Sequence, residues 1–134
     1  MKFVSLLSFL IVSLSVQAQI VFDDYFVDRT MRFDFMLAGN STTTKVYPVS
    51  FREEPFWGGS LVNLTDPFGY GNFRYEVFDD STRTLLYSRG FCTLYQEWQT
   101  TAEARQMERV FHEVATFPFP KNKVNFVLSI RGRD

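Results

Sequence analysis

The segment Thr30-Met31-Arg32-Phe33-Asp34-Phe35-Met36-Leu37-Ala38 alternates between side chains of opposite character. Successive side chains of a β-strand point to opposite faces, so a period of two indicates a strand with one buried face. Arg32 and Asp34 occupy the face that we expect to meet solvent. The other face carries only large apolar side chains, which are Met31, Phe33, Phe35 and Leu37. We therefore predict a half-buried strand here and begin the fold from it.

The same alternation recurs along the chain between clusters of turn residues. Pro48 cannot donate to a strand ladder, so the strand that contains it should lie at a sheet edge. Residues 73–78 and 84–89 flank a polar turn and predict a hairpin. Residues 101–106 favour a short helix, and the alternative is a single long amphipathic helix through residues 94–114. Residues 118–122 predict a stiff turn. The further expected strands are residues 45–51, 73–78, 84–89, 91–98, 109–117 and 124–130, with shorter ones at 19–27 and 61–64.

These patterns predict an all-β fold: a two-sheet antiparallel β-sandwich of about seven or eight short strands with at most one short helix. The composition agrees, because the chain has 16 Phe, 6 Tyr and 2 Trp, and aromatic residues favour strands and cores. The formal net charge is −1, and no basic face suited to several phosphates is visible. Nucleic acid is therefore excluded as an expected partner.

The chain begins with a pattern typical of a secretory signal peptide. Lys2 precedes an apolar run, and Val16-Gln17-Ala18 is a small-residue cleavage site. The run is shorter than the roughly 20 apolar residues that a membrane span needs. We divide the chain into a signal peptide at 1–18 and a β-sandwich domain at 19–134. The product should be exported, to the periplasm, the cell surface or the medium. Cys92 is the only cysteine, so no internal disulfide forms, which favours a bacterial source.

Candidate catalytic residues are few. His112-Glu113-Val114-Ala115-Thr116 has a threonine where a zinc peptidase motif needs its second histidine, and His112 is the only histidine. Cys92 as a nucleophile needs a histidine base, and the spacing to His112 does not require such a pair; we expect a buried, inert thiol. Asp66 or Asp79-Asp80 offers oxygen ligands for calcium, without the spacing of a known loop. The sequence thus predicts no catalytic residue, no cofactor and no metal.

The segment from Glu53 to Asn72 concentrates glycine, proline and large aromatic residues as no other does. A connection of that length in a compact domain is more often functional or self-packed than idle. Trp57, Phe68 and Tyr70 are its candidate contacts with a partner or ligand; the competing interpretation is that they cover the core.

At this point the chain resembles a known family, the N-terminal domain of the IgA-peptidase metallopeptidases, peptidase family 64, found in Bacteroides-like bacteria. The resemblance spans nearly the whole chain after residue 18. The segments that carry it are Phe22-Asp23-Asp24-Tyr25-Phe26, Thr30-Met31-Arg32-Phe33-Asp34, Glu54-Pro55-Phe56-Trp57-Gly58-Gly59-Ser60, Asp66-Pro67-Phe68-Gly69-Tyr70-Gly71-Asn72, Tyr87-Ser88-Arg89-Gly90-Phe91, Glu97-Trp98-Gln99-Thr100-Thr101 and Phe117-Pro118-Phe119-Pro120-Lys121.

The resemblance implies a β-sandwich that precedes a separate zinc-peptidase domain. The metal motif belongs to that domain, so no catalytic residue carries over and this chain is not expected to be an enzyme by itself. The expected function is a non-catalytic accessory domain that packs on the peptidase domain or presents substrate to it, whether the chain is a fragment or a stand-alone copy. The alternative is a stand-alone secreted glycan- or protein-binding module that uses the aromatic residues of the segment from Glu53 to Asn72.

Overall fold

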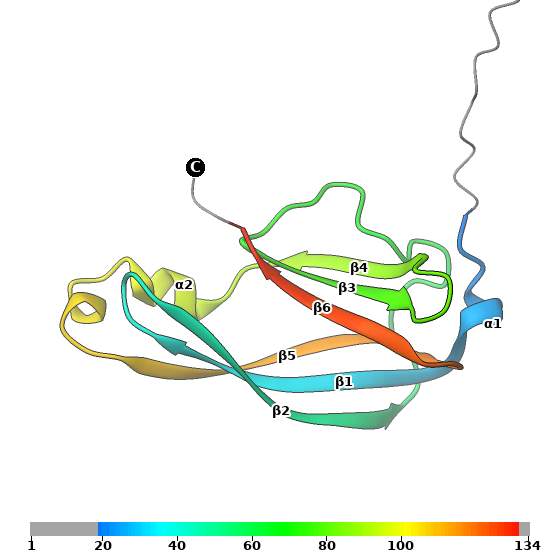
Figure 1. Cartoon of the computed structure of the whole chain (residues 1–134), viewed down its shortest axis with the longest axis horizontal. Coiled ribbons are helices and arrows are strands. Elements are labelled where there is room, and N and C mark those ends of the chain that lie inside the picture. The colour runs from blue at the N-terminus through cyan, green and yellow to red at the C-terminus, as the bar shows by residue number, and fades with distance from the viewer. Residues whose placement is uncertain (1–18, 132–134) are drawn as a thin grey trace, which may run out of the picture.

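Two three-stranded antiparallel sheets pack face to face in the computed structural model, which describes residues 19–131 (Figure 1). The predicted signal peptide and the last three residues lie outside these residues. Sheet A has the strand order β2-β1-β5, and sheet B has the order β4-β3-β6. The strands are β1 Phe26–Gly39, β2 Thr44–Pro55, β3 Phe73–Asp79, β4 Leu85–Phe91, β5 Arg109–Pro120 and β6 Val124–Ile130. The all-β sandwich is confirmed, with fewer and longer strands than the sequence predicted.

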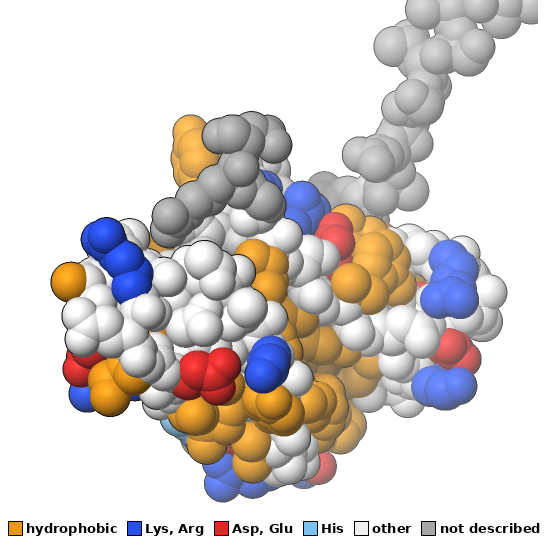
Figure 2. Space-filling model, turned by 60° about the vertical axis from the view of Figure 1, so that its left-hand side comes forward, with side chains coloured by type: hydrophobic (Ala, Val, Ile, Leu, Met, Phe, Trp, Pro, Cys, Tyr) orange, Lys and Arg blue, Asp and Glu red, His pale blue; other side chains and the backbone are white. Residues whose placement is uncertain are grey.

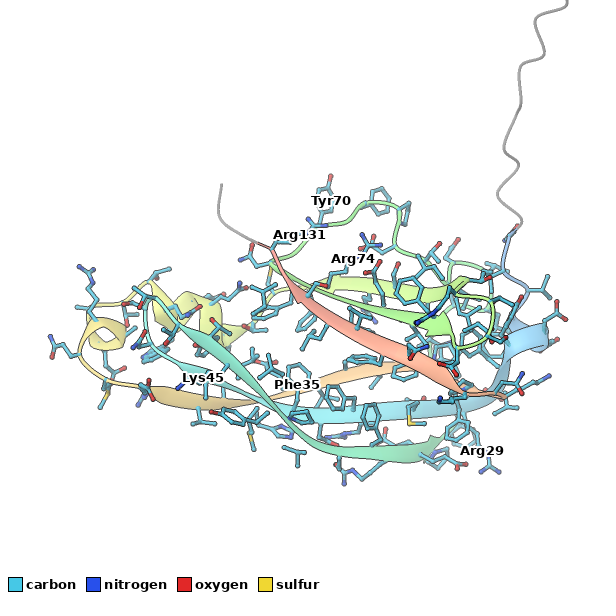
Figure 3. All side chains as sticks on the ribbon, in the orientation of Figure 1. Arg29, Phe35, Lys45, Tyr70, Arg74 and Arg131 are labelled. Carbon is cyan, nitrogen blue, oxygen red and sulfur yellow. The ribbon has the colours of Figure 1, made fainter. Side chains whose placement is uncertain are left out.

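Strand β1 has the two faces that its alternation predicted. Phe35 and Leu37 are fully buried between the sheets, and Phe33 is 4% exposed. Figure 3 shows Phe35 directed into the space between the layers. Burying a phenylalanine or leucine side chain contributes about 1.5–3 kcal/mol, so this stripe accounts for much of the driving force for folding.

The outer face of β1 carries a buried charge, Asp34, which the sequence pattern predicted to meet solvent. Asp34 is only 2% exposed because Arg32 and Arg52 close over its carboxylate at 2.9 and 2.8 Å. His112 Nε2 lies 3.2 Å from the same carboxylate. The bond from Arg32, reinforced by Arg52, holds the pKa of Asp34 well below its usual range. The buried charge is thus neutralised by Arg32 of β1 and Arg52 of β2, and the carboxylate also contacts His112 of β5.

The two sheets share an aromatic core and one hydrogen bond. Phe126 of β6 packs edge-on against Phe33 of β1, with ring centroids 5.0 Å apart, and it also contacts Phe117 of β5. The Tyr75 hydroxyl of β3 donates to the Thr116 carbonyl of β5 at 2.7 Å. Burial raises the pKa of Tyr75, so the hydroxyl keeps its proton and remains a donor.

Helices appear where extended chain was expected. Phe22–Tyr25 forms α1 in place of part of a strand, and residues 61–64 form no strand. The expected strand 91–98 ends early, because the Thr93 side chain accepts from Gln96 N and starts α2, Leu94–Gln99. Only a 3₁₀ turn, η1 at Glu103–Arg105, lies in the predicted helix 101–106, and the long-helix alternative is wrong. Pro118 and Pro120, placed in a turn by the sequence analysis, belong to β5.

The predicted hairpin is present as β3 and β4, and Asp79 organises its turn. One carboxylate oxygen of Asp79 accepts from Ser81 Oγ at 2.6 Å, from Thr82 N at 2.8 Å and from Thr82 Oγ1 at 2.9 Å. These bonds lower the pKa of Asp79 to about 2, the largest effect coming from the Ser81 side chain.

We predict that the Asp79 turn makes stability fall in acid. Because the folded pKa lies below the unfolded value of about 3.9, the contribution is complete above about pH 4 and disappears as the pH falls toward 2. Thermal melts of the wild type and Asp79→Asn from pH 7 to pH 2 test this. The wild type should be more stable at pH 7, and the two melting temperatures should converge in acid; a constant difference would contradict the assignment.

Candidate functional site

The candidate site is the segment of residues 56–72 between β2 and β3, which we call the aromatic loop. It arches over β4, an edge strand of sheet B (Figure 1). The loop begins at Phe56, whose φ is +55° and whose carbonyl accepts from Thr30 Oγ1 at 2.6 Å. Phe56 is 77% exposed, and the sequence analysis did not select it as a contact residue.

The aromatic loop closes the free edge of β4 through backbone hydrogen bonds. Ser88 N donates to the Leu64 carbonyl at 3.0 Å, and Asp66 N donates to Ser88 Oγ at 2.9 Å. Leu64 is 2% exposed and anchors the loop in the core. An unpaired strand edge attracts other strands, so the loop protects this side of the sheet.

Asp66 ties the middle of the aromatic loop to β4. Its Oδ1 accepts from Phe68 N at 3.0 Å and Gly69 N at 3.2 Å, while Oδ2 accepts from Gly90 N at 3.1 Å. Burial raises the pKa of Asp66, but the three backbone donors and the charge of Arg74 outweigh it, so the net pKa is lowered. Asp66 therefore stays ionised at neutral pH and is a structural acceptor.

Trp57 is half-buried and serves the loop itself. Its backbone N donates to Asp28 Oδ1 at 3.1 Å, and its Nε1 donates to the Ser60 carbonyl at 3.1 Å. The ring packs edge-on against Tyr87 of β4, with centroids 5.8 Å apart. Of the three predicted contact residues, Trp57 is therefore the one that also covers the core.

Phe68 and Tyr70 face solvent. Their side chains are 73% and 75% exposed. The two rings are parallel, with an interplanar angle of 5° and centroids 5.9 Å apart. Figure 3 shows Tyr70 directed away from the sheets, above Arg131. The structure thus brings all three predicted residues to one open groove of about 590 Å³, with only Trp57 partly withdrawn.

Two glycines allow the loop to lie directly on the end of β4. A Cβ at Gly90 would lie 1.8 Å from the Tyr70 carbonyl oxygen, which no side chain permits. Gly71 has a φ of +96° and lies against the backbone of Phe91. Close backbone contact with β4 therefore holds the loop beneath Phe68 and Tyr70, which we call the aromatic pair.

The other candidate groups do not form a catalytic site. His112 faces Asp34 on the outer side of sheet A, whereas Cys92 follows β4 in sheet B. Cys92 is exposed, so the expectation of a buried thiol is wrong. Cys92 lies between the last residue of β4 and the Thr93 cap of α2. Of the aspartates considered for calcium, Asp66 accepts through both oxygens and Asp79 through Oδ2 from loop and turn donors. Asp80 accepts from Asn125 and pairs with Lys123. Among residues 19–131, no group of three His, Cys, Asp or Glu side chains is placed to hold a metal.

A comparison with protein-family models identifies residues 21–134 as matching the model described as "Peptidase M64 N-terminus". The chain belongs to this family. The match covers every strand and the whole aromatic loop, and it confirms the resemblance found in the sequence. A search of curated proteins found no match. Within the described part of this M64 N-terminal domain, no helix is long and apolar enough to cross a membrane.

We predict that Gly90→Ala disturbs the aromatic loop, because the new methyl group collides with the Tyr70 carbonyl. The free energy of unfolding should fall by about 1–3 kcal/mol, as for other overpacked sites. Gly58→Ala is the matched control, since nothing lies within 4 Å of a Cβ built there. Denaturant unfolding of the two variants measures the difference; equal stabilities would show that the loop does not rest on β4.

Proposed function

We propose that this domain is a non-catalytic accessory domain that packs against the peptidase domain following it in M64 peptidases. The family match supports an N-terminal domain of a peptidase, because that is what the matched model describes. The exposed rings of Phe68 and Tyr70 support packing against the peptidase domain. Within the same proposal, the chain is exported with residues 1–18 as its leader, as their pattern suggests.

The observation that carries the proposal is where the chain leaves the domain. Arg131 N donates to the Asn72 carbonyl at 2.8 Å, at the end of the aromatic loop. The Arg131 guanidinium lies against Gly69, in the space that a side chain there would fill. Arg131 therefore lies beside the aromatic loop near Tyr70, so a domain that follows in the polypeptide is connected on this side of the molecule (Figure 3).

The chemistry of the aromatic pair suits protein docking. Two neighbouring rings at 73% and 75% exposure present apolar area that a partner can bury. Aromatic side chains are enriched among the few residues that dominate interface energetics, and truncating one often costs about 2 kcal/mol or more. Because Asp66 and the glycines fix the backbone beneath them, little order is lost on binding.

The test uses the longer polypeptide in which the peptidase domain follows this one. Calorimetry should show the two domains unfolding in a coupled transition. Phe68→Ala with Tyr70→Ala should separate the transitions and return this domain to the melting temperature of the isolated chain. The matched control, Leu94→Ala with Met107→Ala, removes two exposed apolar side chains near α2 and η1 and should leave the coupling intact. Coupling that survives the Phe68 and Tyr70 change would refute docking through the aromatic pair.

Glycan binding by the aromatic loop is a second candidate, which the open groove beside Trp57 favours. Aromatic walls together with amide and guanidinium groups, here Asn63 and Arg89, are typical of sugar sites. Under this proposal, an array of glycans should bind the isolated chain, and Trp57→Ala should abolish the signal. Retained binding by Trp57→Ala, or no binding by the wild type, would remove this candidate.

A further inference from the structure

The four outer edges of the two sheets differ in how their unpaired backbone groups are protected. Exposed edges carry unpaired backbone groups, and proteins blunt them with prolines, charges, bulges or a covering segment. The edges here belong to β2 and β5 in sheet A and to β4 and β6 in sheet B. The aromatic loop covers β4 through Leu64 and Asp66.

Both edges of sheet A are blunted. β2 contains Pro48 and charged residues at Arg52, Glu53 and Glu54, and its pairing with β1 shifts so that Val49 is an extra residue. β5 contains Pro118 and Pro120. Proline lacks the N–H that a further strand would need, and a bulge twists the edge away.

The edge of β6 has none of these protections. Its sequence, Val-Asn-Phe-Val-Leu-Ser-Ile, contains no charge and no proline, and its pairing with β3 runs without a register shift. Among residues 19–131, only β3 pairs with it. Val127 is 41% exposed and Ile130 is 45% exposed. A regular, uncharged strand edge of this kind is a template for pairing with another strand.

Phe51 of β2 leaves an exposed apolar surface next to β6. It lies opposite Phe33 on the inner face of sheet A, and the two rings stack with centroids 4.4 Å apart. It also meets Phe126 of β6 edge-on at 6.1 Å. Yet Phe51 is 53% exposed, although it lies on the face that the sandwich buries elsewhere. Figure 2 shows hydrophobic side chains reaching the surface in a band across the middle and lower part of the molecule.

We propose that β6 accepts a fourth strand of sheet B, supplied by the polypeptide that follows this domain in M64 peptidases. The inference rests on the proposed function, because it names the backbone contact through which the next domain docks. β6 is the last strand of the described residues, so polypeptide that follows it starts at the end of the free edge, where a tight turn returns it antiparallel. Apolar side chains at alternate positions of that strand cover Phe51.

Hydrogen exchange on the isolated chain and on the two-domain polypeptide tests the added strand. In the isolated chain, the β6 amides that do not face β3 should exchange rapidly. In the two-domain protein these amides should exchange at least about tenfold more slowly, because they become hydrogen-bonded. Phe51→Ser should reduce that protection by removing the apolar floor of the new strand.

Tyr47→Ser is the matched control. Tyr47 is also a half-exposed aromatic residue of β2, but it lies opposite Met36, on the outer face of sheet A, and should leave β6 protection unchanged. Unprotected β6 amides in a protein whose domains still unfold together would overturn the added strand and leave the docking proposal standing. Domains that unfold independently, with rapid β6 exchange, would overturn both.

Discussion

Every backbone N–H and C=O at the edge of a sheet needs a partner, and this constraint shapes the domain around the aromatic loop. The loop supplies the Leu64 carbonyl and the Asp66 carboxylate to β4 where a further strand would otherwise lie. Asp66 suits the task because one ionised carboxylate accepts from both the loop and the strand. The concentration of glycine in this segment follows from the same contact, since Gly71 and Gly90 let two backbones meet.

Strands whose side chains alternate could be predicted from the sequence. A helix whose start depends on a short-range hydrogen bond could not. β6 was predicted at its observed bounds, and β1 and the β3–β4 hairpin were predicted within a few residues, because the sequences of β1, β3 and β6 alternate and polar turn residues separate the hairpin strands. α2 was missed because its start depends on a single Thr93 cap, while Tyr95 and Trp98 also fit a strand. Pro118 and Pro120 suggested a turn, but an edge strand tolerates proline on its open side.

The candidate surface was only partly readable from sequence. Residue type identified Trp57, Phe68 and Tyr70 as the aromatic residues of an unusual loop. It did not show that Trp57 packs on Tyr87 while the other two face solvent, because exposure depends on contacts between segments remote in sequence. The position of Arg131 against Gly69 was equally invisible, as was the burial of Asp34 beneath two arginines. From the charge pattern alone, such an aspartate is predicted to be exposed to solvent.

The aromatic loop separates the residues that hold its shape from the residues that it displays. Leu64, Asp66 and Gly71 determine the path of the backbone, whereas the side chains of Phe68 and Tyr70 face solvent and stack on each other. Displayed side chains of this kind can be exchanged during evolution without refolding the domain. Substitutions at these two positions can therefore change the displayed surface while the scaffold is kept, much as an antibody framework carries different binding loops.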